Sequence, residues 1–328
     1  MRSERLDRAL RDGVWVLPAT GRIAVYRPRQ GDDLSALPRD RVVVLTGFRP
    51  DHDHFAAQGY AVVPAPPYAA ALVCLPRARD HARALLAQAA AEVAPGGPVA
   101  FDGQKTDGFE PALRDLRSRL AVGEVLSKAH GKLAVFAAGT ELRDWAAAPR
   151  QVEGGFQTLP GVFSADGPDR ASELLAAALP EKLGPKVADL GAGWGYLGRA
   201  VLARQGVKRL DLVEAEAEAL ACARANISDD RARFHWADAT RFRPENLVET
   251  VVMNPPFHLG READPTLGAA FIAAARGMMA PDGALYLVAN RHLPYDAALN
   301  AAFLEVETIG GDSAFRVIRA ARPRRARG

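Results

Sequence analysis

Residues 251–258 end an apolar run in side chains that can take part in chemistry. Asn254 is followed by Pro255, Pro256 and Phe257. Proline lacks a backbone donor and disfavours helical geometry in the residue before it, so the two prolines hold the chain extended and rigid just after Asn254. The segment is either a rigid strand exit with Phe257 in the core, or a device that aims the Asn254 amide at a ligand.

The second interpretation predicts the methylation of a planar amine. Such an amine, on a nucleobase or an amide, is a poor nucleophile because its lone pair is delocalised. If the Asn254 carboxamide oxygen and the Pro255 carbonyl each accept one amine hydrogen, the lone pair is localised and held by preorganised dipoles. Phe257 would stack on the planar group. We therefore expect Asn254, Pro255 and Phe257 to be the catalytic residues.

An aspartate and alternating glycines occur earlier in the chain. The pattern D-x-G-x-G-x-G comprises Asp189, Gly191, Gly193 and Gly195. Glycines at this spacing let the backbone turn tightly and approach a ligand, but phosphate-binding turns are glycine-rich too. The Asp189 carboxylate argues against a phosphate, because it would repel a pyrophosphate and attract an ammonium group.

Two further acids complete a ligand set. Glu214 can accept from both hydroxyls of a ribose, and Asp238 can accept from an adenine amine. A ligand that carries an ammonium group, a ribose and an adenine but no phosphate is S-adenosylmethionine. Taken singly, each acid could equally be a helix cap or a solvated strand end; as an ordered set, the three acids predict a cofactor site.

Alternating strands and helices position these side chains. Apolar runs predict strands at 186–190, 209–214, 232–236, 249–253 and 284–290, with helices between them. Such alternation predicts an α/β, Rossmann-like fold with a mostly parallel sheet, and ligands bind beyond the carboxyl ends of its strands. Asp189, Glu214, Asp238 and Asn254 lie at successive strand ends, so we expect them to line one crevice.

The composition sets the wider limits. The chain has 328 residues, 48% of them hydrophobic, which is enough for two cores, and we expect domains at 1–150 and 151–328. The net charge of +3 is compatible with an RNA partner without demonstrating one. Two separated cysteines argue against disulfides and cysteine zinc sites, and no apolar run reaches the roughly 18 residues of a membrane span. We expect a soluble cytoplasmic protein.

The glycine turn together with MNPPFH resembles class I S-adenosylmethionine-dependent methyltransferases that act on exocyclic or amide nitrogens. Three stretches narrow the resemblance: TLPGVFSADGPDRASELL, NPPFHLG, and VANRHLPYDAALNAAF with the later FRVIRA. Together they look like the small-subunit ribosomal RNA guanine-N2 methyltransferase C family, which also includes a large-subunit guanine enzyme. The likeness is strong over residues 156–320 and looser over 40–150.

The resemblance implies a function. Members of the family transfer a methyl group to the exocyclic amine of guanine, which implies the acceptor role for Asn254 and the stacking role for Phe257. Ribosomal RNA or the small ribosomal subunit is the implied partner, S-adenosylmethionine is the cofactor, and a monomer is the default expectation. The expected cofactor-binding residues are Asp189, Gly191, Ala192, Gly193, Glu214, Asp238, Asn254 and Phe163.

The first half of the chain echoes the second. Residues 42–48, 71–76, 78–93 and 94–105 follow the same order as 187–193, 251–256, 268–279 and 280–291. We interpret this as an internal duplication; chance likeness between two alanine-rich segments is the alternative. Leu75-Pro76 stands where Asn254-Pro255 would be, so the first copy should keep the fold and lose the chemistry. The family likewise carries a degenerate amino-terminal methyltransferase-like domain that helps to hold RNA or the catalytic half.

Other conspicuous residues have ordinary explanations. Asp51-His52-Asp53-His54 suggests a metal site, but four adjacent ligands rarely converge on one ion and a helix start favours such acids, so no metal is expected. His258 adjoins the catalytic tetrapeptide and is a candidate for a substrate contact, although amine methylation needs no strong base.

Two basic features are compatible with an RNA partner. Lys105 is either an RNA contact or a solvated loop charge. The end of the chain, FRVIRAARPRRARG, is either a disordered, solvated extension or a grip on RNA phosphates. Its arginines, with no acid among them, are Arg316, Arg319, Arg322, Arg324, Arg325 and Arg327.

Three other functions stay open. The N-P-P-[FY] pattern also serves the methylation of adenine amines and of a protein glutamine amide. A different class is a ribosome assembly factor that binds S-adenosylmethionine and depends on RNA binding more than on turnover. The intact catalytic set argues against this last class.

Overall fold

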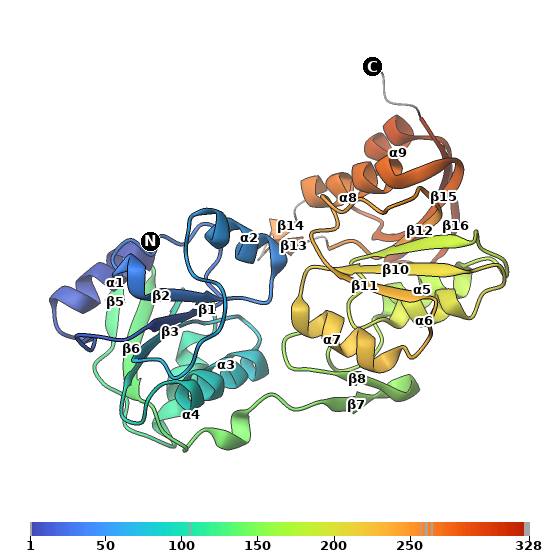
Figure 1. Cartoon of the computed structure of the whole chain (residues 1–328). Coiled ribbons are helices and arrows are strands. Elements are labelled where there is room, and N and C mark those ends of the chain that lie inside the picture. The colour runs from blue at the N-terminus through green and yellow to red at the C-terminus, as the bar shows by residue number, and fades with distance from the viewer. Residues whose placement is uncertain (1, 105, 257, 260–261, 264, 325–328) are drawn as a thin grey trace. The chain divides into compact units, whose positions relative to one another are not determined.

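The computed structural model describes residues 2–104, 106–256, 258–259, 262–263 and 265–324. The chain divides into two compact units, Met1–Pro149 and Arg150–Gly328. In each unit a sheet is covered by helices on both faces (Figure 1). The α/β, Rossmann-like fold that the sequence predicts for both halves is confirmed.

The second unit is built on a seven-stranded sheet in the order β11-β10-β9-β12-β15-β17-β16. The first five of these are mutually parallel, whereas β17 pairs antiparallel with β15 and β16. All five strands expected from apolar runs are present. The strands are β9 (Lys186–Leu190), β10 (Arg209–Glu214), β11 (Ala232–Trp236), β12 (Val248–Met253), β15 (Met279–Asn290), β16 (Phe303–Gly311) and β17 (Phe315–Pro323).

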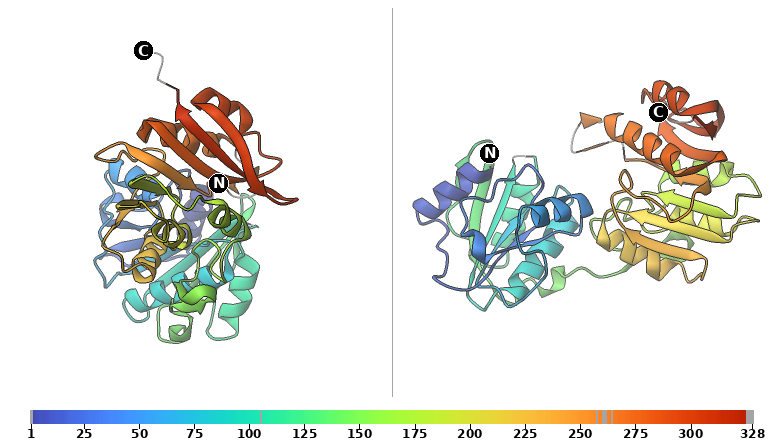
Figure 2. Two further views of the ribbon diagram at one scale, coloured as in Figure 1. Left: turned by 90° about the vertical axis from the view of Figure 1, so that its right-hand side faces the viewer. Right: turned by 45° about the horizontal axis from the view of Figure 1, so that its top comes forward.

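Helices cover both faces of this sheet (Figure 2). Helices α8 (Pro265–Met278) and α9 (Asp296–Ala302) pack on one face, and α5 (Arg170–Ala178) and α6 (Tyr196–Leu202) pack on the other. Helix α7 (Ala217–Asn226) connects β10 to β11. The central strands are therefore buried on both sides, which is why they read as continuous apolar runs.

Shorter elements complete the second unit. Two-stranded pairs are formed by β7 (Arg150–Val152) with β8 (Phe156–Thr158), and by β13 (His258–Leu259) with β14 (Glu262–Ala263). Residues 281–283 lie inside β15. Val248 pairs with Met279 and Thr250 with Ala284, so the register shifts here and the intervening residues bulge from the ladder.

The first unit holds a six-stranded sheet in the order β2-β1-β3-β4-β6-β5. Helices α1 and α2 pack on one face, and α3 and α4 on the other. The elements are α1 (Arg2–Arg11), β1 (Ile23–Tyr26), β2 (Val42–Leu45), α2 (Arg49–Ala57), β3 (Ala70–Cys74), α3 (Arg79–Glu92), β4 (Pro98–Gln104), α4 (Phe109–Arg117), β5 (Leu126–Lys128) and β6 (Gly131–Ala137). Single 3-10 turns lie at Arg39–Arg41, Arg143–Trp145 and Glu153–Gly155.

The strand orders show how the two copies correspond. The order β2-β1-β3-β4-β6-β5 matches β10-β9-β12-β15-β17-β16, with parallel and antiparallel pairs in the same places. Strand β3 thus corresponds to β12, and Leu75-Pro76 follows β3 as Asn254-Pro255 follows β12. The expected match of 42–48 with 187–193 is wrong by one strand, because β1 and not β2 occupies the place of β9. Strand β1 has only four residues and leads into Arg27 rather than a glycine turn, which concealed the match.

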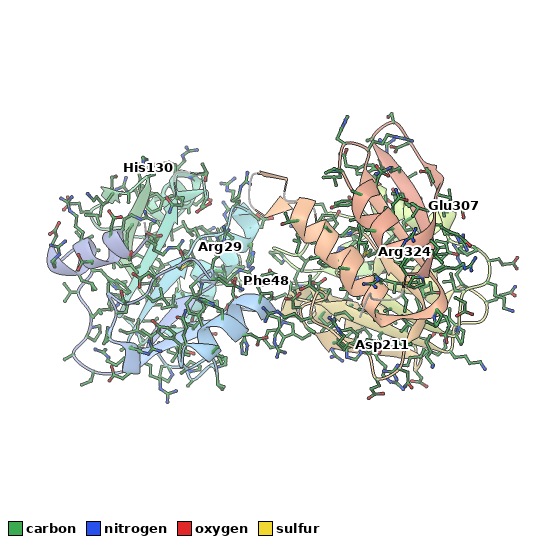
Figure 3. All side chains as sticks on the ribbon, turned by 90° about the horizontal axis from the view of Figure 1, so that it is seen from above. Arg29, Phe48, His130, Asp211, Glu307 and Arg324 are labelled. Atoms are coloured by element: carbon green, nitrogen blue, oxygen red, sulfur yellow. The ribbon has the colours of Figure 1, made fainter. Side chains whose placement is uncertain are left out.

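The arginine-rich end is a folded part of the sheet over most of its length. Residues Phe315–Pro323 form β17, which lies between β15 and β16. Arg324, labelled in Figure 3, donates to the carbonyl oxygens of Asn300 and Phe303. The disordered extension is therefore wrong for residues 315–324, and Arg325 and Arg327 lie outside the described residues. Acids of α9 and β16 pair with the arginines of β17: Asp296 with Arg316, Glu307 with Arg319, and Glu305 with Arg322.

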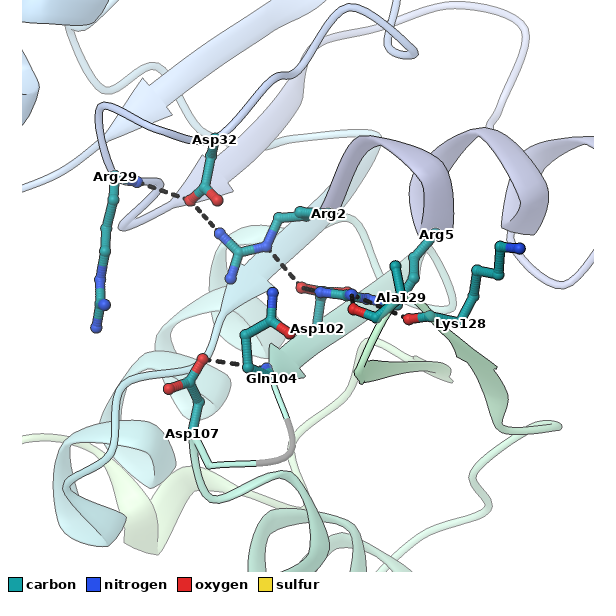
Figure 4. Close-up of polar contacts among 9 residues, drawn as sticks. All are labelled: Arg2, Arg5, Arg29, Asp32, Asp102, Gln104, Asp107, Lys128 and Ala129. Carbon is teal, nitrogen blue, oxygen red and sulfur yellow. Dashed lines mark hydrogen bonds and ion pairs between the residues drawn. The ribbon is translucent and has the colours of Figure 1, made fainter. Parts of the chain in front are cut away.

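A buried cluster of two arginines and an aspartate ties α1 to the first sheet (Figure 4). Asp102 on β4 and Arg5 are fully buried, and Arg2 is 7% exposed. Asp102 Oδ2 accepts from Arg5 Nε at 2.6 Å, and Asp102 Oδ1 accepts from Arg2 Nε at 2.6 Å. Arg5 also donates to two backbone carbonyls of the β5–β6 turn. A Cβ at Gly131 would lie 2.5 Å from Arg5 Cζ, so only glycine fits beside this side chain.

We expect Asp102→Asn to destabilise the protein by about 3–5 kcal/mol, because it leaves the buried Arg5 without its counter-charge and Arg2 with Asp32 alone. The measurement is the free energy of unfolding in urea. The control is Arg8→Ala on the same helix, which removes only the exposed 3.0 Å pair with Asp12 and should cost less than about 1 kcal/mol. Equal losses for the two variants would contradict the prediction.

Candidate active site

The glycine turn between β9 and α6 docks on the end of β10. The backbone N–H groups of Gly191 and Ala192 donate to the Val213 carbonyl at 2.9 and 3.1 Å, and the N–H of Gly193 donates to Glu214 Oε2 at 2.8 Å. Gly191 and Gly193 have φ angles of 76° and 54°, a left-handed conformation that favours glycine. A Cβ at Gly193 would meet no atom within 4 Å, so the turn is open on that side.

Trp194 anchors the outer side of the same turn. Its indole Nε1 donates to the Phe163 carbonyl at 2.9 Å, and its ring meets Phe156 edge to face with centroids 4.9 Å apart. Asn226, at the end of α7, donates to the Trp194 carbonyl at 2.8 Å. The large residue that the sequence places in the turn therefore holds segment 156–163 against the glycines.

Asn254 lies directly after β12, and its amide nitrogen is held by two acceptors. Nδ2 donates to Asp169 Oδ2 and to Ser172 Oγ, both at 2.9 Å. Among the described residues, no donor contacts Asn254 Oδ1. Pro255, the next residue, is buried. The amide is thus held by its nitrogen end, with its oxygen available as an acceptor.

The sequence analysis did not single out Asp169 and Ser172. Asp169 caps α5, because its Oδ2 accepts from the Ser172 N–H at 2.9 Å. An aspartate just before an apolar helical segment is a helix-start signal, which the sequence does carry. Nothing in the sequence connects that cap with a residue 85 positions further on.

A pocket joins the glycine turn to Asn254. Five of the expected site residues line it: Phe163, Gly191, Ala192, Gly193 and Asn254. Phe163 is 60% exposed, which is unusual for a large apolar side chain and places it at the rim. Asp169 and Ser172 line the pocket as well. The structure thus brings Asn254 and the glycine turn to one cavity.

Asp189 lies beneath the turn and does not line this pocket. Its side chain is fully buried, and neither carboxylate oxygen has a hydrogen-bond partner among the described residues. Burial, with the negative charge of Glu214 as a second cause, raises the pKa of Asp189 to about 8. Burying a carboxyl group without a hydrogen-bond partner costs free energy, and a positively charged ligand nearby would offset that cost.

Glu214 and Asp238 lie at the ends of the next two strands. Glu214 Oε2 accepts from the Gly193 N–H, and its Oε1 accepts from the Glu216 N–H at 2.8 Å. Burial raises the pKa of Glu214, although these N–H groups act in the opposite direction. Asp238 caps a turn, since its Oδ1 accepts from the N–H and the hydroxyl of Thr240. Both acids lie at the carboxyl edge of the sheet, but neither lines the pocket.

Some expected residues cannot be placed. Phe257 and Lys105 lie outside the described residues, as does the side chain of His258. Within the ranges given above, no three histidine, cysteine, aspartate or glutamate side chains form a group that could hold a metal ion. In the same ranges, no helix is long and apolar enough to cross a membrane.

Comparison with known proteins gives this site its context. The methyltransferase small domain family matches residues 153–319, which is half of the chain. The ribosomal RNA small subunit methyltransferase C of Pseudomonas paraeruginosa is 33% identical over 267 residues, covering 78% of this chain and 80% of the relative. That of Alteromonas mediterranea is 30% identical over 260 residues, covering 76% and 72%.

A solved structure is similar over both units. The T. thermophilus 16S rRNA N2 G1207 methyltransferase in complex with AdoMet and guanosine aligns with a TM-score of 0.78 and 26% identity, over 97% of this chain and 91% of that chain. Fold, pocket and family match together make the second unit a class I methyltransferase domain. The chain belongs to the ribosomal RNA small subunit methyltransferase C family, and the family expected from the sequence is confirmed.

Asp189 should make the stability of the protein depend on pH. Its pKa is about 8 in the folded chain and about 3.9 in the unfolded chain. Between about pH 4 and pH 8 the carboxyl group is therefore ionised in the unfolded chain but still protonated in the folded one. Rising pH therefore favours unfolding through this group, by up to about 1.4 kcal/mol per pH unit. Asp189→Asn cannot ionise, and its free energy of unfolding should change less with pH than that of the wild type.

Urea unfolding at several values between pH 5 and pH 8 measures this slope. Asp230→Asn, an exposed aspartate of the same unit, is the matched control and should keep the wild-type slope. An Asp189→Asn slope equal to the wild type would show that this carboxyl does not titrate in that range.

Proposed function

We propose that this protein transfers the methyl group of S-adenosylmethionine to the exocyclic N2 amine of a guanine in 16S ribosomal RNA. The observation that carries the proposal is the Asn254 amide, whose nitrogen is bound to Asp169 and Ser172 while its oxygen is left to accept from a ligand beside the glycine turn. Family membership, and the guanosine and AdoMet named with the T. thermophilus enzyme, support this substrate and cofactor.

The residues of the chain suit S-adenosylmethionine in two respects. The buried Asp189 carboxyl lacks a partner, and the positive charge of this cofactor would favour its ionised form. The glycine turn is open beside Gly193, where a side chain would intrude. When bound, the cofactor supplies an electrophilic methyl group on a positively charged sulfur.

The acids at the strand ends are assigned to the rest of the cofactor. Each oxygen of Glu214 accepts one backbone N–H, which orients the carboxylate and leaves further lone pairs for two ribose hydroxyls. Asp238 Oδ1 is occupied by Thr240, so Oδ2 is the atom assigned to the adenine amine. Asp189, beneath the turn, is assigned to the ammonium and sulfonium charges, which would favour its ionised form when the cofactor binds.

Asn254 and Pro255 prepare the amine. The Asn254 oxygen and the Pro255 carbonyl each accept one amine hydrogen, so that the lone pair of the nitrogen is localised and directed at the methyl group. Pro255 and Pro256 hold both acceptors in place before the substrate arrives, and positioning of this kind is a large part of catalysis. Phe257 is assigned to stacking on the guanine.

The first unit is assigned to holding RNA or supporting the catalytic unit. The net charge of +3 falls entirely in the first unit, because basic and acidic residues are equal in number from Arg150 to the end. A positive surface attracts the RNA backbone. The proposal places the enzyme in the cytoplasm, on ribosomal RNA or on the small ribosomal subunit.

Nucleoside mass spectrometry of 16S ribosomal RNA tests the reaction. Cells that lack this protein should lack one N2-methylguanine, and the wild-type gene should restore it, whereas Asn254→Ala should not. Loss of N6-methyladenine, or of a methylated glutamine in a protein, would assign the site to those substrates instead. Restoration by Asn254→Ala would point to an assembly factor whose turnover is dispensable.

Cofactor affinity separates binding from chemistry. Glu214→Ala should weaken S-adenosylmethionine binding by about 1 kcal/mol or more, the scale of a charge-assisted hydrogen bond. Asn254→Ala should leave the affinity within a few-fold, because its amide acts on the nucleophile. Calorimetry on both variants makes the comparison, and unchanged affinity in a folded Glu214→Ala protein would remove Glu214 from the cofactor site.

A further inference from the structure

We infer that Asp169 and Ser172 are positioning residues that hold the Asn254 amide in the one orientation that can accept the substrate amine. The inference rests on the proposed function and deepens it, because it concerns how the catalytic amide is oriented. Its basis is the pair of 2.9 Å hydrogen bonds from Asn254 Nδ2 to Asp169 Oδ2 and Ser172 Oγ.

The chemistry of Asp169 decides which end of the amide faces it. An ionised carboxylate only accepts hydrogen bonds, so it binds the NH₂ end of a carboxamide and repels the oxygen end. The oxygen is therefore turned away from Asp169. A carboxamide free to rotate would spend part of its time with NH₂ toward the substrate, where it would oppose an incoming amine donor.

Helix α5 holds Asp169 and Ser172 in fixed positions. Asp169 is the N-cap of α5, and the same Oδ2 that accepts from Asn254 also accepts from the Ser172 N–H at 2.9 Å. Ser172 is 8% exposed, and α5 packs on the sheet through Ala171 and Leu175. A single helix start thus presents both acceptors. Asn254 is held from one side by this helix and from the other by its two prolines.

The charge of Asp169 has a second effect. A carboxylate hydrogen-bonded to the NH₂ group polarises the amide and increases the negative charge on its oxygen. The substrate nitrogen would gain positive charge as its bond to the methyl carbon forms and the bond from that carbon to sulfur breaks, with the electron pair passing to sulfur. The product ammonium would then lose a proton to water. A more negative oxygen in contact with that nitrogen's hydrogens stabilises this charge in the transition state more than in the ground state, which raises kcat.

Two substitutions separate positioning from helix capping. Asp169→Ser keeps an N-cap oxygen but is one atom shorter, so it removes the contact with Asn254. Asp169→Asn keeps the cap and the reach, but it loses the charge and can donate to the oxygen it should repel. Ser172→Ala removes the second acceptor, and Ser228→Ala is its matched control, since Ser228 is an exposed serine of the same unit that does not line the pocket.

The measurements are kcat and KM for methyl transfer to unmethylated 16S ribosomal RNA, S-adenosylmethionine affinity by calorimetry, and the urea midpoint. We expect kcat to fall on the order of 10- to 100-fold in Asp169→Ser, less in Asp169→Asn and Ser172→Ala, and not at all in Ser228→Ala. KM, cofactor affinity and the urea midpoint should stay near the wild type. A wild-type kcat in Asp169→Ser, or a loss accompanied by an equal fall in cofactor affinity or stability, would overturn the inference.

A second background tests whether Asp169 acts through Asn254. In Asn254→Asp, an acceptor oxygen faces the substrate whichever way the side chain turns, and its charge is repelled by Asp169. Asp169→Ser should then leave kcat unchanged or raise it, the opposite of its effect on the wild type. A fall of the same size in both backgrounds would assign Asp169 to the fold alone.

The two proposals fail separately. If Asn254→Ala methylates RNA at the wild-type rate, Asn254 is not catalytic and the proposed function loses its main observation. Asp169 and Ser172 then have no catalytic amide to orient. If Asn254→Ala is inactive while Asp169→Ser is fully active, the proposed function stands and only the positioning inference is wrong.

Discussion

The parallel pairing of β9 with both β10 and β12 is the constraint on which the site depends. In this register Asp189 lies between Leu212 and Val252, so Glu214 and Asn254 emerge at the same edge of the sheet. The glycine turn then hydrogen-bonds to the end of β10, which closes it over Asp189. The register of each strand pair thus sets how far along the sheet edge each strand-end residue lies. A slip of one residue would turn the side chains of that strand to the other face.

Sequence reasoning correctly predicted the strands and the residues at their ends. Strands buried on both faces are continuous apolar runs, so the positions of Asp189, Glu214 and Asn254 could be predicted. Asp169 was missed because its partner lies 85 residues away and a helix cap has no sequence mark of a second role. The arginine-rich end was misread for a similar reason. The acids that pair with Arg319 and Arg322 lie on β16, across a hairpin, and not in the same stretch.

The two sheets share an order of strands but differ in the residues at the strand ends. Among the described residues, the first unit has the strand order of the second without a counterpart of β11, and Leu75-Pro76 stands where the second unit has Asn254-Pro255. Its stability rests on its own core and on the buried ion cluster around Asp102, neither of which the chemistry needs. The same strand order therefore occurs here both with and without the residues proposed to bind the ligand.

The place of β17 has a consequence for how the catalytic unit is made. This strand comes after every other strand in the chain, yet it lies between β15 and β16 rather than at an edge. Until it is synthesised, β16 has no partner in the sheet and β15 presents an open edge of unpaired backbone groups. Domains generally fold as units during synthesis, and the sheet of the second unit cannot be completed until β17 has been synthesised. A protein truncated before Phe315 would carry the whole proposed catalytic constellation and still expose a sheet edge prone to aggregation.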